Sequence, residues 1–216
     1  MSEPTRPLRA PTRLPLLLVL GLTALFAGIA AYRTLNSSGP PGLAAVYPEP
    51  RPLPAIALLA QDGSRFDRSH LTGHYTLLFL GYTNCPDVCP TTLMELAGAR
   101  RALASLPASL QPAVVMLSVD PLRDTPAVLA RYVPHFDPTF IGVSGTDAAL
   151  QAWARALGAM YAAEPAQDGA YRVDHSAALF LIDPSARLLA VYPATPSAAS
   201  LAADYAHLVR TRNGTS

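Results

Sequence analysis

Lysine is absent from this 216-residue chain, and cysteine occurs only twice, at Cys85 and Cys89. The basic residues are 16 arginines against 15 acidic residues, which gives a formal net charge of +1. A nucleic-acid binder carries a strongly basic stripe or face, and this charge balance excludes that class of protein. A small secreted fold held by disulfides needs more cysteines over a shorter chain, so that class is excluded too.

One long apolar run lies near the N-terminus. Residues 14–32, LPLLLVLGLTALFAGIAAY, would span about 28 Å as a helix, close to one hydrocarbon core. Three arginines precede the run and Arg33 alone follows closely. The positive-inside bias therefore predicts a cytoplasmic tail, residues 1–13, and one transmembrane helix in the inner (cytoplasmic) membrane. The rest of the chain is then periplasmic or otherwise extracytoplasmic. A cleaved signal peptide is the alternative, and it also exports the domain.

Residues 33–52, RTLNSSGPPGLAAVYPEPRP, are rich in proline and glycine, a composition typical of a semi-extended linker. Residues 53–212 follow as one domain, and residues 213–216 are expected to form a short tail. Within the domain, apolar runs alternate with helical patterns, which favours a parallel core with right-handed crossovers. The order predicts an α/β, thioredoxin-like fold, a mixed central sheet flanked by helices. The expected strands are a hairpin over 53–66, buried strands over 76–82, 113–118 and 139–143, and a hairpin over 177–192.

The two cysteines stand in the segment Cys85-Pro86-Asp87-Val88-Cys89, directly after a predicted buried strand and at the start of a predicted helix. Sites in open α/β sheets lie at the carboxyl ends of strands, and a helix N-terminus favours thiolates. If the first turn is helical, the spacing of four puts both sulfurs on one side of it, so that they can straddle an ion.

Two thiolates select Cu(I), zinc or iron–sulfur chemistry. A structural zinc site usually takes four protein ligands, and this chain cannot supply four cysteines. One imidazole added to the two thiolates gives a three-coordinate site that suits copper, as Cu(I) and/or Cu(II).

His175 is the histidine that the pattern favours as the third ligand. It is flanked by Asp174 at the entrance to a predicted buried strand over 177–182, and a thioredoxin-like fold brings that entrance beside the cysteines. A strand-entrance histidine with no ligand role is the alternative. Asp174 is a candidate for orienting the imidazole through its ring N–H, with a plain surface aspartate as the alternative. The other histidines fit loop or surface positions: His70, His74, His135 and His207.

Three charged residues, Asp120, Arg123 and Asp124, are interpreted as a turn held by charge pairs. On this interpretation the three residues stabilise the fold and take no part in the metal site.

Four segments resemble the Sco/SenC family of cytochrome c oxidase copper-assembly proteins: LFLGYTNCPDVCPTTL, LSVDPLRDTP, FIGVSGT and YRVDHSAALFLIDP. The resemblance runs from about Leu53 to Val209. It implies that Cys85, Cys89 and His175 bind one copper ion in a membrane-anchored metallochaperone. It also implies that the protein helps assemble the dinuclear copper site of the oxidase. The implied partners are the copper-binding oxidase subunit and other copper chaperones or thiol reductases.

The main alternative is a thiol–disulfide oxidoreductase, in which Cys85 and Cys89 keep the cysteines of that target, or of other exported proteins, reduced. Whether the protein is an enzyme depends on this alternative. Thioredoxin relatives place a cis-proline where this chain has residues 174–176, which weighs against a general reductase. A peroxidase of peroxiredoxin type fits two cysteines four apart poorly. A merely structural Cys85–Cys89 disulfide closes too short a loop to add much stability.

Overall fold

The computed structural model describes residues 19, 21–26, 28, 43–165 and 171–214. The chain divides into two compact units, Met1–Gly42 and Leu43–Ser216. The predicted tail 1–13, most of the predicted span 14–32 and the first part of the predicted linker lie outside the described residues. Within the span, residues 21–26 are helical. In the described part of the chain we find no helix with the length and apolar character that a membrane crossing requires.

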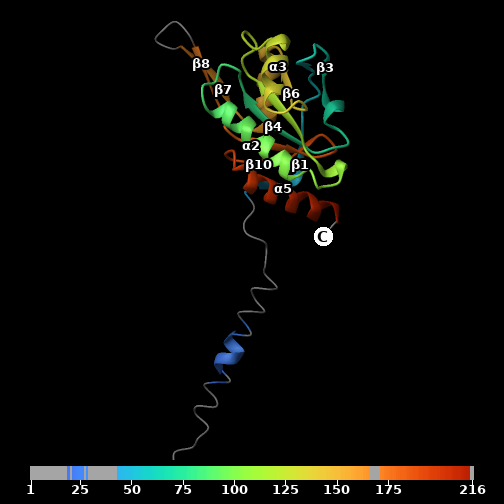
Figure 1. Cartoon of the computed structure of the whole chain (residues 1–216), viewed down its shortest axis with the longest axis vertical. Helices are drawn as coiled ribbons and strands as arrows, with labels where there is room; N and C mark the ends of the chain where they lie inside the picture. The colour runs from blue at the N-terminus through green and yellow to red at the C-terminus, as the bar shows by residue number, and fades with distance from the viewer. Residues whose placement is uncertain (1–18, 20, 27, 29–42, 166–170, 215–216) are drawn as a thin grey trace, which may run out of the picture. The chain divides into compact units, whose positions relative to one another are not determined.

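The second unit is built on one mixed sheet with the strand order β1-β10-β9-β4-β5-β6-β2-β3 (Figure 1). Strands β4, β5 and β6 pair in parallel, and β9 joins β4 antiparallel. All six residues of β4 are buried, as the continuous apolar run TLLFLG predicts for a central strand. The strands are β1 (Ala45–Pro52), β2 (Leu58–Ala60), β3 (Arg65–Phe66), β4 (Thr76–Gly81), β5 (Ala113–Ser118), β6 (Ile141–Ser144), β9 (Leu179–Ile182) and β10 (Arg187–Tyr192).

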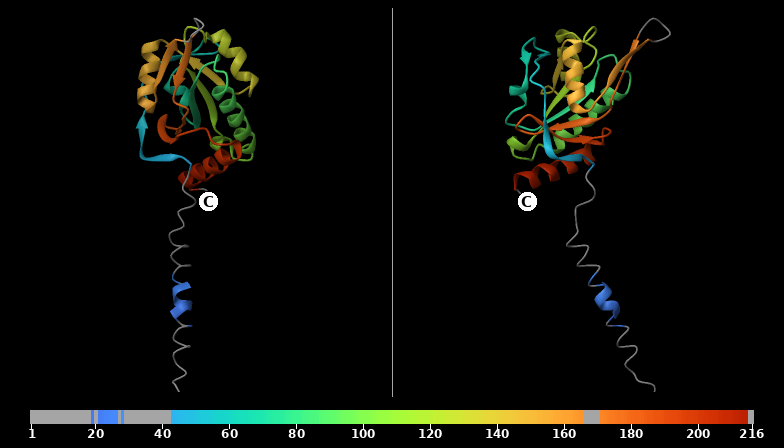
Figure 2. Two further views of the ribbon diagram at one scale, coloured as in Figure 1. Left: turned by 90° about the vertical axis from the view of Figure 1, so that its left-hand side faces the viewer. Right: turned by 180° about the vertical axis from the view of Figure 1, so that it is seen from behind.

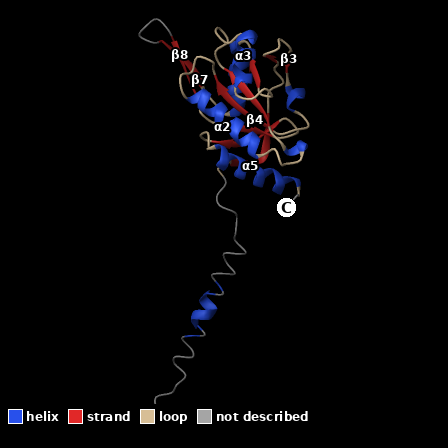
Figure 3. Cartoon of the chain, viewed as in Figure 1, coloured by secondary structure: helices blue, strands red, loops and turns tan. Residues whose placement is uncertain are grey.

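Helices cover both faces of this sheet (Figure 3). Helices α2 and α3 lie on one face and α4 on the opposite face (Figure 2). Helix α5 packs against α2 at very short range, because a Cβ at Gly98 would lie 2.7 Å from the Cβ of Ala198. The helices are α2 (Val88–Ala102), α3 (Pro126–Tyr132), α4 (Asp147–Leu157) and α5 (Ala198–Asn213), with 3-10 turns η1 (Arg68–Leu71), η2 (Ala108–Leu110) and η3 (Val133–His135).

The helix boundaries follow local capping chemistry. Thr125 stands at the N-cap of α3 with Pro126 in the first turn, where proline's missing N–H and fixed φ are favourable. The side chain of Thr146 accepts a hydrogen bond from the third residue beyond it and so caps α4. Gly158 ends α4 with φ 75°, a left-handed conformation that favours glycine.

The boundaries of the predicted linker and tail need correction. Residues 45–52, which composition places in the linker, form β1 at the edge of the sheet, paired antiparallel with β10. Proline lacks the N–H that a central strand must donate, so a proline-rich strand fits only such an edge. At the other end, α5 continues to Asn213, whose amide donates to the Tyr75 hydroxyl at 2.8 Å. The predicted hairpin over 53–66 begins only at Leu58.

A second, two-stranded sheet was not expected from the sequence. Strands β7 (Tyr161–Pro165) and β8 (Tyr171–His175) pair antiparallel and project from one end of the domain (Figures 1 and 2). The five residues of β8, YRVDH, alternate in polarity and in exposure, but only Val173 is buried, so the pattern is too short and too weakly apolar to predict a strand from the sequence. The β7–β8 hairpin carries His175 at its last position.

Candidate metal centre

The cysteine half of the site begins where β4 ends. A short loop leads from Gly81 through Cys85 to the first turn of α2, which contains Cys89. The backbone N–H of Cys89 points at the sulfur of Cys85, with N and Sγ 3.4 Å apart. The predicted position after a buried strand and at the start of a helix is therefore confirmed.

The two thiols have opposite electrostatic environments. Burial raises the pKa of the Cys89 thiol, and the neighbouring Cys85 raises it further. Burial also opposes ionisation of Cys85, but backbone N–H groups of Cys89, Asp87 and Val88 donate toward its sulfur and lower its pKa overall. Cys85 is the half-exposed, more readily ionised thiol, and Cys89 is the buried one. Both are free thiols.

His175 reaches the cysteines from the other side of the site. It ends β8 rather than opening the next strand, so the predicted strand entrance is corrected to the end of the β7–β8 hairpin. Its Nε2 lies 3.4 Å from the Cys89 Sγ. Its Nδ1 lies 3.1 Å from the carbonyl oxygen of Ser176, and the Tyr82 ring stands nearly perpendicular to the imidazole at 5.9 Å. The imidazole is thus oriented by a backbone carbonyl and an aromatic ring.

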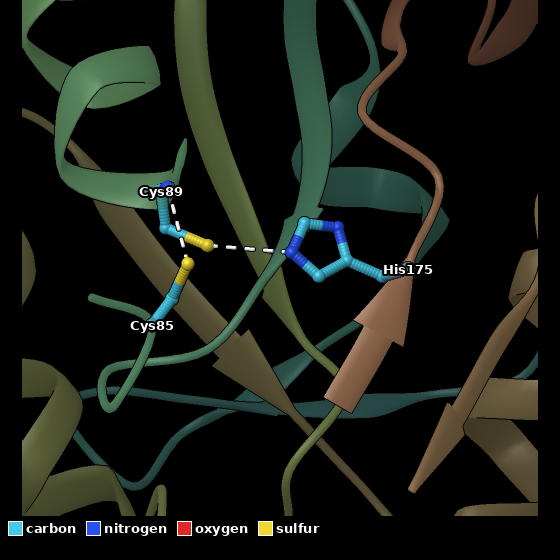
Figure 4. Close-up of side chains that lie close together, drawn as sticks. All are labelled: Cys85, Cys89 and His175. Atoms are coloured by element: carbon cyan, nitrogen blue, oxygen red, sulfur yellow. Dashed lines mark hydrogen bonds between the residues drawn. The ribbon is translucent and has the colours of Figure 1, made fainter. Parts of the chain in front are cut away.

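The structure brings together all three residues that the sequence singles out as donors (Figure 4). One donor atom from each of Cys85, Cys89 and His175 lies within 4.8 Å of the other two. Donors bound at about 2.0–2.3 Å from one ion are at most about 4.6 Å apart, so this spacing nearly fits a single ion. In the described part of the chain, no other group of three such side chains is found.

A cavity of about 230 Å³ opens onto this cluster and is lined by Cys85, Val88 and His175, among others. The side chain of Asp174 is exposed and lines the same cavity. The hydrogen bond at Nδ1 of His175 goes to the Ser176 carbonyl, and orientation of the ring by Asp174 stays a prediction. The cavity gives an ion or a partner's side chain access to the donors.

Residues 53–210 match the sequence profile of the family described as SCO1/SenC, which is most of the chain. The chain belongs to the SCO1/SenC family. A Stutzerimonas stutzeri protein, named as a candidate copper-binding protein, is 35% identical over 174 residues, 80% of this chain and 83% of the relative.

Solved structures of SCO1/SenC proteins are similar over the same domain. Arabidopsis thaliana ScoI with copper bound is 31% identical, with a TM-score of 0.68, over 72% of this chain and 96% of that one. Bradyrhizobium japonicum ScoI with copper bound is 33% identical, with a TM-score of 0.64, over 72% and 98%. These likenesses confirm the predicted thioredoxin-like, mixed α/β fold.

The sequence interpretation missed the residues that hold the SCO1/SenC site together. The predicted charge pair between Arg123 and Asp120 is present. Asp124 is buried like Asp120, but its carboxylate accepts hydrogen bonds from Thr83 and Ser118. Tyr82, whose ring packs against the imidazole, directly precedes the segment that leads to Cys85. The position of Tyr82, an aromatic residue between a buried strand and the cysteine motif, was the one feature of the sequence that could have indicated this contact.

Proposed function

We propose that this protein binds one copper ion through Cys85, Cys89 and His175. The observation that carries the proposal is the approach of these three donors to within 4.8 Å of one another. Two soft sulfurs and one imidazole suit copper. A structural zinc site usually has four protein ligands, and this site has three. The copper-bound ScoI structures, similar over 72% of this chain, support the choice of metal.

We further propose that the copper is cargo rather than a resident cofactor. Three protein ligands leave a coordination position open to a ligand from a partner, and the cavity beside Cys85 and His175 gives that ligand a route. Family membership suggests the dinuclear copper site of cytochrome c oxidase as the destination. The apolar run over 14–32, with arginines before it, suggests a single membrane anchor that holds the domain on the extracytoplasmic side.

Copper titration of single variants tests the three-ligand site. We expect Cys85→Ser, Cys89→Ser and His175→Ala each to weaken copper binding strongly, because each removes one of three ligands. His207→Ala is the matched control, since His207 is an exposed histidine on α5. Binding that is equally tight in His175→Ala and in the wild type would contradict the site as proposed.

A fusion experiment tests the anchor and its orientation. Alkaline phosphatase, which is active only outside the cytoplasm, is joined after residue 44 of the full-length N-terminal segment. We expect an active fusion that stays with the membrane fraction and is not released by alkaline carbonate. An active fusion released in soluble form would favour the cleaved signal peptide instead.

A thiol–disulfide oxidoreductase is the second candidate, favoured by the unequal thiols. The half-exposed Cys85 has a lowered pKa and suits attack on a target disulfide, from which one sulfur leaves and takes up a proton. The buried Cys89, with its raised pKa, then loses its proton and attacks Cys85, which releases the second target sulfur. One target disulfide is reduced and one Cys85–Cys89 disulfide forms. Strong general reductase activity with negligible copper affinity would favour this function.

A further inference from the structure

One loop contacts both halves of the proposed copper site. This loop, residues 119–125, connects β5 to α3 and is called here the 119–125 loop. On the cysteine side, buried Asp124 accepts hydrogen bonds from the backbone N–H and the hydroxyl of Thr83, at 2.9 and 2.6 Å. It also accepts one from the Ser118 hydroxyl at 2.6 Å. Because Thr83 stands two residues before Cys85, the loop is tied directly to the cysteine segment.

On the histidine side, the same loop holds Tyr171, the first residue of β8, at the end of the strand opposite His175. The Nε of Arg123 pairs with the carboxylate of Asp120, and its Nη1 donates to the Tyr171 carbonyl oxygen at 3.1 Å. The guanidinium lies 3.8 Å from the centroid of the Tyr171 ring. The Tyr171 hydroxyl donates to Asp120 at 2.5 Å. Arg123 therefore contacts both the backbone carbonyl and the aromatic ring of Tyr171.

Two routes lead from Arg123 to His175. The first runs along β8, where Tyr171 is the first residue and His175 the last. The second runs through Tyr82, whose ring centroid lies 5.7 Å from the Arg123 guanidinium and 5.9 Å from the imidazole. Strand β8 pairs with β7 alone among the described strands, so these side-chain contacts supply restraint that the main sheet does not.

We propose that Arg123 is a positioning residue for His175. By fixing Tyr171 to the 119–125 loop, it holds the β7–β8 hairpin at the distance from the cysteines at which the imidazole completes the copper site. Loss of Arg123 loosens the histidine half, which keeps the hydrogen bond from Tyr171 to Asp120, while the cysteine half stays in place. The role in copper retention rests on the proposed function, whereas the restraint on the hairpin does not.

The chain offers a matched control for a merely structural role. Arg187 pairs with Asp183 through Nε and Nη2, at 3.1 and 2.9 Å, in the turn between β9 and β10. Both arginines therefore form an ion pair that stabilises a turn, and only Arg123 contacts the hairpin that carries His175. Arg123→Met and Arg187→Met remove the same charge and keep most of the stem.

The first experiment uses the metal-free protein. We expect Arg123→Met to speed amide hydrogen exchange in β8 about tenfold or more and to leave β4 unchanged, because a hydrogen bond to a charged group is lost. Arg187→Met should leave exchange in β8 unchanged. Unaltered β8 exchange in Arg123→Met, or equal acceleration in the two variants, would overturn the positioning role.

The second experiment measures copper release to a chelator in a double-mutant cycle. We expect Arg123→Met to speed release about tenfold in the wild-type background and not at all when His175→Ala is already present. In the electron paramagnetic resonance spectrum of the Cu(II) protein, the hyperfine splitting from the histidine nitrogen should weaken in Arg123→Met and stay unchanged in Arg187→Met. Equal acceleration with and without His175 would refute the inference. Wild type and His175→Ala releasing copper equally fast would instead refute the proposed ligand set, and hydrogen exchange would still decide the role of Arg123.

Discussion

Cys89 and His175 approach to 3.4 Å, yet the elements that carry them are built differently. The cysteines follow β4, whose six residues are all buried and which pairs with β5 on one side and β9 on the other. His175 ends a five-residue strand with one buried side chain, paired with β7 in a sheet of two strands. One half of the site is part of the core, and the other half is attached to it.

The difference teaches where the site can open. An isolated two-stranded hairpin is marginally stable in water, whereas a central strand opens only when the whole domain unfolds. We therefore expect the histidine to be the donor that moves without unfolding of the domain and the cysteines to be the more firmly held donors. Such a division would suit the proposed role of copper as cargo, an ion that is held and then handed on.

The largest effect is expected from the core beneath the cysteines. Leu78 in β4 is completely buried, so Leu78→Ala should lower the free energy of unfolding by about 2–5 kcal/mol. Val173→Ala in β8 removes two methyl groups and should cost about 1.5 kcal/mol at most. Denaturant unfolding measures both variants. Equal losses would break the distinction between a core half and an attached half.

The next effect concerns the buried carboxylate that ties the cysteine segment to the 119–125 loop. Asp124→Ala leaves the Thr83 N–H and the Ser118 hydroxyl without their acceptor and should destabilise the domain by about 2–4 kcal/mol. Asp124→Asn keeps an acceptor oxygen and should cost less. Thermal unfolding of the two variants provides the measurement. A loss from Asp124→Ala no greater than that from the exposed substitution Asp62→Ala would count against this role.

A smaller effect is expected at Gly81, the last residue of β4. A Cβ there would lie 2.9 Å from the Phe79 ring and 3.3 Å from the Cys89 sulfur. Gly81→Ala should therefore cost about 1–3 kcal/mol and displace Cys89, because the packed core must shift to admit a methyl group. Denaturant unfolding and the thiolate-to-copper absorption band together check the result. If the absorption band does not change, the structure around Cys89 has absorbed the added methyl group. The cysteine half would then be less rigid than its burial in the core suggests.

The core half of this contrast is also the half that the sequence predicts well. Strands β4 and β5 are continuous apolar runs, and α4 has its apolar residues at helical spacing between a threonine cap and Gly158. The two cysteines are close in sequence, so local rules place them together. Each of these features depends on residues that are close together in the sequence, so the sequence alone is enough to predict it.

The attached half has only a short, weak local pattern and depends on contacts between residues far apart in the chain. Strand β8 has one buried residue, and Arg123 meets Tyr171 across 48 positions of the chain. The proline-rich β1 becomes a strand only because β10 offers it an edge. The nearness of His175 to the cysteines was therefore expected from the fold and the family resemblance, whereas the hairpin that delivers it was not.

The smallest effect is expected at the open end of the hairpin. The Ser176 hydroxyl accepts a hydrogen bond from the Met160 N–H at 3.0 Å, and Met160 is 80% exposed. Ser176→Ala should cost only about 0.5–1 kcal/mol, because the freed N–H can bond to water. The Ser176 carbonyl that faces the Nδ1 of His175 remains, so the imidazole tautomer should not change. Amide exchange at Met160 and the ¹⁵N shifts of the imidazole measure the two outcomes.

The same substitution at Ser197 supplies the control for Ser176→Ala. Ser197 caps α5 by accepting from the Ser200 N–H, so Ser197→Ala should lower global stability by about 1 kcal/mol and leave exchange in the hairpin unchanged. Ser176→Ala should show the reverse, with faster exchange confined to β7 and β8. If Ser176→Ala instead speeds exchange in β4, the hairpin is coupled to the core. His175 would then be as firmly fixed as the cysteines, and the division into a held and a moving half would be lost.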